Sequence, residues 1–194
     1  MADEHLLERI AQSLRTARAS VTPGEVRAAA PTGEHDSILS RAAELYGARP
    51  TSDDTPPTGF DPAAAALFEA LVEGAFLVAH ADGEFDAEER AAFEQVVLAA
   101  TKGRVAGEQL TALLADLEQQ LGEDGAEVRL AFLAKSVAKP EHQREVVRVA
   151  ALMGQISGGV SDVERGVLVR IAQGFGLGEA AVSDAMTAAE AVLG

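Results

Sequence analysis

Apolar side chains recur at helical spacing along most of the chain. In residues 3–18 they lie at positions i, i+3, i+4 and i+7, which is the pattern of an amphipathic helix. A shorter helix is predicted over residues 37–48. Further helices are predicted over 63–81, 86–100, 107–121, 123–138, 140–156, 161–175 and 179–193. The connections between these seven are short, so the pattern predicts an all-α, compact seven-helix bundle.

The stretch ARPTSDDTPPTGFDP (48–62) interrupts this regularity with four prolines. Such a composition is typical of a linker. We therefore predict an N-terminal helical extension over residues 1–60, made of an amphipathic helix, a short helix and this proline-rich linker. The helical domain is predicted to span residues 61–194, with Asp61 as the cap and Pro62 as the first residue of its first helix.

The composition favours a helical core and excludes every kind of site that requires cysteine. Hydrophobic residues make up 47% of the chain, whereas aromatic residues make up only 4% and tryptophan is absent. A core of alanine, leucine and valine favours helices over strands. Because cysteine is absent, disulfides, thiolate metal sites and cysteine nucleophiles are excluded.

The net charge is −15, from 31 acidic and 16 basic residues. Such a surface repels nucleic acid and anionic membranes, and it attracts cations or a protein partner with a basic surface. The N-terminal residues lack the basic region and apolar run of a signal peptide. No stretch approaches the roughly 20 apolar residues of a membrane-spanning helix. We therefore expect a cytoplasmic protein without direct membrane insertion.

Two segments of the predicted domain are similar to each other. Residues 74–97 align with residues 149–172 in a 75-residue register without a gap. The register pairs turn with turn and helix start with helix start: Gly83 with Gly158, Asp86 with Ser161, and Glu89 with Glu164. The alignment predicts an internal pseudo-two-fold repeat.

Helix capping explains most of the shared positions without a ligand. Asp86-x-x-Glu89 and Ser161-x-x-Glu164 both fit the capping box, in which the first side chain and the glutamate each accept a backbone N–H. The glycine before each box permits the positive φ of a tight turn.

The first loop nevertheless carries more acid than capping requires. Asp82, Glu84 and Glu88 have no acidic counterpart in the second loop. The spacing of Asp82, Asp86 and Glu89 allows their oxygens to converge on a divalent cation such as calcium or magnesium, with Glu84, Glu88 or water completing the shell. The loop is not an EF-hand, because glycine directly follows the first aspartate.

No motif of a known catalytic type is present. The sequence has no Walker, HExxH or GxSxG element, and its four histidines are scattered. We therefore predict that the protein is not an enzyme. A carboxylate-based hydrolase stays open as an alternative, and it requires a pocket that holds His80 and two acids.

ADGEFDAEE (81–89) and LVRIAQGFGLGEAAV (168–182) together resemble the tellurite-resistance TerB-like family and the related N-terminal domain of the DjlA co-chaperone. The resemblance covers residues 63–193. It implies an all-helical, pseudo-symmetric bundle without known enzymatic activity, associated with tellurite resistance and other stress responses. It also implies a metal-binding role for the acidic residues. Asp82, Gly83, Asp86 and Glu89 match the first motif and Glu164 matches the second, while Ser157 departs from the family pattern.

We therefore expect a non-enzymatic, stress-response module that binds a divalent cation at the acidic loop. An acidic protein-interaction scaffold that binds no metal is the alternative.

Overall fold

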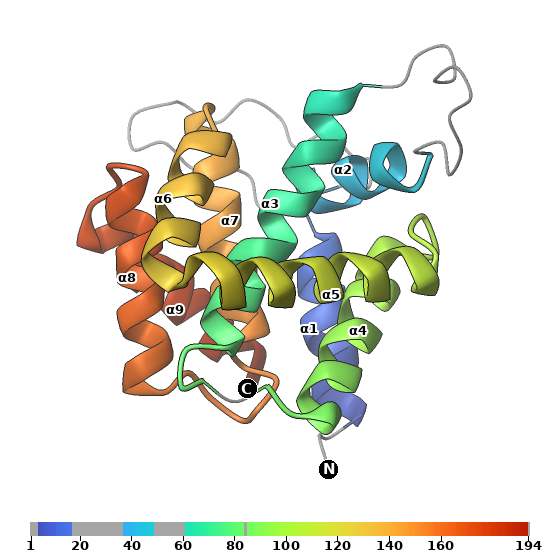
Figure 1. Ribbon diagram of the computed structural model, residues 1–194. Helices are drawn as coiled ribbons and strands as arrows, with labels where there is room; N and C mark the ends of the chain where they lie inside the picture. The colour runs from blue at the N-terminus through green and yellow to red at the C-terminus, as the bar shows by residue number, and fades with distance from the viewer. Residues whose placement is uncertain (1–3, 17–36, 49–60, 84, 194) are drawn as a thin grey trace, which may run out of the picture.

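The computed structural model describes residues 4–16, 37–48, 61–83 and 85–193, which form helices around one hydrophobic core (Figure 1). The helices of these ranges are α1 (Glu4–Arg15), α2 (Ile38–Gly47), α3 (Pro62–Ala79), α4 (Ala87–Thr101), α5 (Gly107–Asp124), α6 (Ala126–Ser136), α7 (Pro140–Met153), α8 (Asp162–Gly174) and α9 (Glu179–Leu193). No strand occurs in them. The all-α prediction is confirmed.

The predicted helices all exist, and their ends differ from the predicted ones by a few residues. The boundary between α5 and α6 was expected near Gly122, but α5 continues through this glycine to Asp124. The chain turns instead at Gly125, which has a φ of 79°. Glycine adopts such a φ without the steric cost that a Cβ brings.

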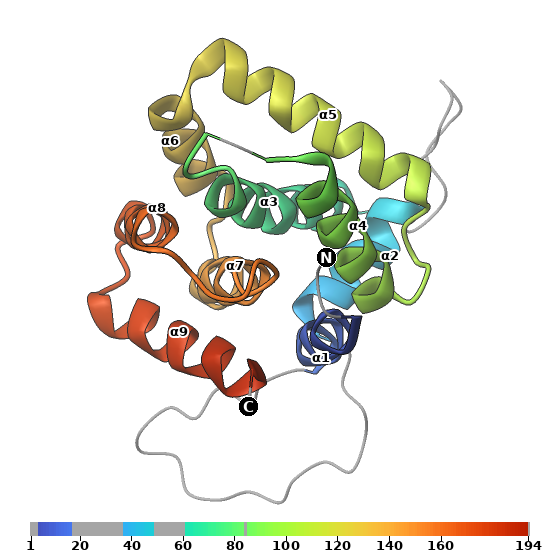
Figure 2. The same ribbon diagram turned by 90° about the horizontal axis from the view of Figure 1, so that it is seen from below.

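Helix α3 is the central helix of the fold (Figure 2). Phe68, Leu71 and Phe76 on this helix are almost fully buried. At Gly74 an added Cβ would lie 2.6 Å from Val146 Cγ1 of α7, so the glycine permits the close approach of the two helices. Among the described residues, α3 alone is long and apolar enough to cross a membrane, contrary to our expectation from the sequence. Of the 18 residues of α3, 61% are buried inside the fold, as in a core helix.

The bundle contains nine helices in the described ranges rather than the predicted seven, because α1 and α2 share the core of the other helices. Leu7, Ile10 and Leu14 of α1 are buried. Arg15 Nε of the same helix donates to the carbonyl oxygen of Ala99 in α4 at 3.0 Å. The predicted domain boundary near residue 60 lies outside the described residues and stays a prediction.

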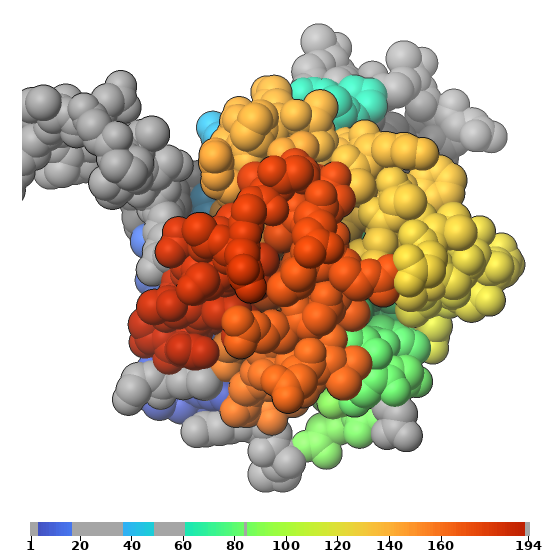
Figure 3. Space-filling view, turned by 90° about the vertical axis from the view of Figure 1, so that its left-hand side faces the viewer, coloured from blue at the N-terminus to red at the C-terminus, as the bar shows by residue number. Residues whose placement is uncertain are grey.

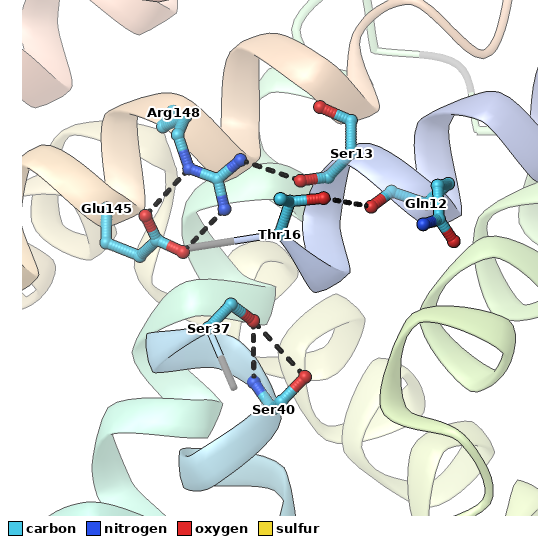
Figure 4. Close-up of polar contacts among 7 residues, drawn as sticks. All are labelled: Gln12, Ser13, Thr16, Ser37, Ser40, Glu145 and Arg148. Atoms are coloured by element: carbon cyan, nitrogen blue, oxygen red, sulfur yellow. Dashed lines mark hydrogen bonds and ion pairs between the residues drawn. The ribbon is translucent and has the colours of Figure 1, made fainter. Parts of the chain in front are cut away.

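Two buried glutamates form ion pairs inside the bundle. Arg129 of α6 binds Glu73 of α3, and its Nη1 lies 3.4 Å from Asp124 Oδ2. Burial raises the pKa of Glu73, and the bond and charge of Arg129 oppose this rise. On α7, Arg148 makes two bonds of 2.7 Å to Glu145 and donates to the carbonyl oxygen of Ser13 on α1 at 3.2 Å (Figure 4). The Arg129–Glu73 pair joins α6 to α3, and the hydrogen bond from Arg148 to Ser13 joins α7 to α1.

Candidate functional site

The acidic loop connects α3 to α4 at the lower end of α3 in Figure 1. Gly83 has a φ of 87°, and its N–H donates to the carbonyl oxygen of His80 at 3.1 Å. Asp82, Asp86 and Glu88 are all exposed. Glu84 lies outside the described residues.

Asp86 and Glu89 form the predicted capping box at the start of α4. Asp86 Oδ1 accepts the backbone N–H groups of Glu88 and Glu89, both at 2.8 Å. Glu89 Oε2 accepts the N–H of Asp86 at 3.2 Å. One oxygen of each carboxylate is therefore engaged in starting the helix.

The loop between α7 and α8 has the same local geometry. Gly158 has a φ of 96°, and its N–H donates to the carbonyl oxygen of Gln155 at 3.0 Å. Ser161 Oγ accepts the N–H of Glu164 at 3.3 Å, and Glu164 Oε2 accepts the N–H of Ser161 at 2.7 Å. Both predicted capping boxes are confirmed. The capping boxes concern only the two loops, so the pseudo-two-fold repeat of the whole bundle stays a prediction.

Aromatic side chains fill the space behind the acidic loop. The ring of Phe85 meets Phe76 and Phe93 edge to face, at centroid distances of 5.6 and 5.8 Å. The His80 ring lies 5.5 Å from that of Phe76. Edge-to-face packing adds stability beyond area burial and holds the loop against the core. His80 is thus a packed neighbour of this cluster.

The two motif loops share one small cavity. Its volume is ≈ 20 Å³, enough for one water-sized particle. Its polar lining residues are Glu89, Ser157 and Glu164, and its apolar ones are Ala79, Phe85, Phe93, Met153 and Ile156. At the lower edge of the face in Figure 3, the segment after α7 lies beside the segment after α3. The two glutamates that the 75-residue register aligns therefore meet at one place.

The capping boxes use only one carboxylate oxygen of each glutamate in this pair. Glu89 and Glu164 are half-buried, and each uses Oε2 for its cap. Their Oε1 atoms make no hydrogen bond or ion pair with any residue that the structure describes. Sequence reasoning aligned these two glutamates but did not predict that they face a common cavity.

The predicted set of Asp82, Asp86 and Glu89 is only partly brought together. Asp86 and Glu89 bond to each other's backbone, but only Glu89 lines the shared cavity. Within residues 4–16, 37–48, 61–83 and 85–193, no three side chains of the metal-binding types lie close enough to hold an ion. The three-ligand site stays a prediction.

The sequence matches the family described as "Tellurite resistance protein TerB" over residues 68–188. This match covers more than half of the chain. The chain belongs to the TerB family. Comparisons with curated proteins and with solved structures gave no match. The TerB match includes both motif loops and the shared cavity, whereas α1 and α2 precede it.

Proposed function

We propose that the protein is a non-enzymatic TerB module of a cytoplasmic stress response, and that it binds a divalent cation such as calcium or magnesium between its two motif loops. The observation that carries this proposal is the pair formed by Glu89 and Glu164 at one cavity. Carboxylate and hydroxyl oxygens are suitable ligands for these hard cations. Asp82 and Asp86 supply further negative charge beside the same loop.

The chemistry of the cavity favours an ion over a substrate. A volume of ≈ 20 Å³ accepts a single ion or water molecule and no organic molecule. His80 does not line this cavity, so the acid–histidine arrangement that the hydrolase alternative requires is not supported here. The cation would instead neutralise like charges on two helix starts and draw the loops together.

Calorimetry with calcium, magnesium, manganese and zinc tests the proposal. The variants Glu89→Gln and Glu164→Gln remove one charge each and keep an oxygen for the capping box, since glutamine also serves there. Each is expected to lower cation affinity by about tenfold, as expected for the loss of one charged contact. Asp82→Ala and Asp86→Asn test the rest of the predicted set.

Glu108→Gln is the matched control, because it removes the same charge from an exposed first turn, that of α5. It is expected to change the affinity little. An equal loss of cation affinity in all variants would mean that binding depends only on the net charge of the protein. Saturable binding that survives both Glu89→Gln and Glu164→Gln would place the ion elsewhere, and absence of binding at millimolar cation would refute the proposal.

The second candidate function is that of an acidic interaction module for a basic protein partner. The exposure of Asp82, Asp86 and Glu88 favours it, because exposed carboxylates are accessible to a basic surface. A partner that co-purifies with the protein, dissociates as salt is raised and is insensitive to chelators would support this candidate. A partner that binds only with the cation present would join the two functions, and a salt-insensitive partner would contradict this one.

A further inference from the structure

A second cavity lies at the opposite end of α3 from the acidic loop. Its volume is ≈ 420 Å³, within the range of small-molecule sites. It lies among the start of α3, helix α2 and the connection from α6 to α7, near the top of Figure 1. The described residues that line it come from all of these elements, so the fold itself builds the cavity.

Basic side chains line this cavity in a protein that is otherwise strongly acidic. Arg41 and Lys139 both line it with exposed side chains, and neither side chain forms an ion pair or hydrogen bond with any residue that the structure describes. His142 also lines the cavity and is half-buried. The two basic side chains supply positive charge that an anion would neutralise.

Charges of both signs surround His142. Burial lowers the pKa of His142 most, the charge of Glu141 raises it, those of Lys139 and Arg41 lower it, and that of Glu145 raises it. The charged groups around the imidazole come from three elements: Arg41 on α2, Asp61 at the start of α3, and Lys139, Glu141 and Glu145 on α7. Of the three acids, Glu145 binds Arg148, Asp61 caps α3, and Glu141 is exposed in the first turn of α7.

The start of α7 adds backbone donors at the same wall. Lys139 is its N-cap residue, and its side chain makes no capping bond. The first N–H groups of a helix have no partner inside the helix, and the helix dipole favours an anion there. Because Lys139 and His142 line the cavity, this end of α7 borders it.

Asp61 and Ser136 also line the cavity, and the remaining wall is apolar. It consists of side chains from α2, α3 and the α6–α7 connection: Ile38, Ala42, Leu45, Ala63, Ala64, Leu67, Val137 and Ala138. A cavity with one basic side and one apolar side is suited to a ligand with both characters. A bare inorganic anion would leave the apolar wall in contact with water.

We propose that this cavity binds a small organic anion, with its acidic group between Arg41, Lys139 and His142 and its apolar part against Leu45, Leu67 and Val137. The ligand class is a carboxylate or phosphate monoester with a short hydrocarbon chain. The proposal is independent of the cation site, which lies at the other end of α3.

Calorimetry with hexyl phosphate and hexanoate tests the site, and the two probes distinguish phosphate from carboxylate recognition. Inorganic phosphate lacks the apolar part, and hexanamide lacks the charge, so both are expected to bind at least about tenfold more weakly. Arg41→Gln and Lys139→Gln are expected to weaken binding by about tenfold each. Lys135→Gln is the matched control, since Lys135 is exposed on α6 outside the cavity.

Imidazole NMR of His142 gives a second readout that does not depend on affinity. A bound anion is expected to raise the pKa of His142, because it offsets the charges of Arg41 and Lys139. Failure of both hexyl probes to bind at millimolar concentration would overturn the proposal. Binding that is unchanged by Arg41→Gln and Lys139→Gln, or that leaves the His142 resonance unmoved, would do the same.

Discussion

The end of α3 that leads into Gly83 carries exposed carboxylates, whereas the end that begins at Pro62 borders a cavity with basic side chains. The helix has 18 residues, so the two regions are about 27 Å apart along its axis at 1.5 Å per residue. At this distance exposed charges are largely screened from each other at physiological salt. The two ends can therefore attract ligands of opposite charge.

The difference also concerns how tightly each end is built. At the acidic end, capping bonds and edge-to-face aromatic packing hold the loops around a cavity of ≈ 20 Å³. At the basic end, the side chains of Arg41 and Lys139 form no hydrogen bond or ion pair with a described residue, and they line a cavity of ≈ 420 Å³. We propose an ion for the first region and a small organic molecule for the second. The net charge of −15 is a property of the whole chain and does not show that basic side chains line a cavity at one end of α3.

The largest effect is expected from a change that weakens the packing of α3, because both regions lie at its ends. Arg129→Gln leaves Glu73 buried without its cation, and we expect a loss of about 2–3 kcal/mol in the free energy of unfolding, less than for a fully buried pair. Chemical denaturation measures this loss. The double variant Glu73→Gln/Arg129→Gln is expected to lose less, because no uncompensated charge stays buried. Equal losses in both variants would contradict this explanation.

The same ion pair predicts a dependence on pH. The folded-state pKa of Glu73 lies above its ordinary value, so the folded protein holds the proton more strongly than the unfolded one. This group therefore favours folding at low pH, and its contribution is lost as the pH rises through the raised pKa. In Arg129→Gln the rise in pKa is larger, so the destabilisation is expected to shrink on acidification. A destabilisation that grows on acidification would contradict the assigned sign.

A smaller change at the acidic end separates capping from ligand binding. Asp86→Ala and Ser161→Ala are each expected to cost about 1 kcal/mol of stability, because each removes a side-chain cap. Asp86→Asn keeps a capping oxygen and is expected to preserve stability within a few tenths of a kcal/mol. Thermal unfolding compares the three. If Asp86→Asn were as unstable as Asp86→Ala, the charge and not the cap would be essential for folding.

The smallest expected effect lies at the basic end. Arg41→Gln removes one of the charges that lower the pKa of His142, so this pKa is expected to rise. The folded-state pKa of His142 lies below its ordinary value, so its contribution to stability is present at higher pH and lost on acidification. NMR titration of the imidazole follows the shift. An unchanged or lower pKa in Arg41→Gln would show that the guanidinium does not act on the cavity.

The helices and caps could be predicted from the sequence because their signals are local. Helical spacing, Asp61-Pro62 and the two capping boxes each depend on residues within a few positions of one another. The boundary predicted near Gly122 was wrong, because the sequence alone does not distinguish a glycine inside a helix from one that follows it. The φ of Gly125, which marks the true boundary, depends on how α5 and α6 pack.

The parts that could not be predicted depend on contacts between distant segments. Arg129 binds the buried Glu73, which lies 56 positions away in the sequence. Arg148 donates to the carbonyl oxygen of Ser13, which lies 135 positions away. The cavity shared by Glu89 and Glu164 joins residues 75 positions apart. No local sequence pattern predicts that these two residues line one cavity, because their proximity depends on the packing of α3 beside α7.

Manganese titration followed by NMR tests most directly whether a cation lies between the two loops, since this paramagnetic ion broadens nearby signals. The amide signals of Gly83 and Gly158 are expected to broaden together at substoichiometric manganese, while those of Arg41 and His142 stay sharp. Glu164→Gln is expected to reduce the broadening at both glycines. Broadening spread evenly over the acidic surface, or confined to Gly83, would contradict a cation held between the loops.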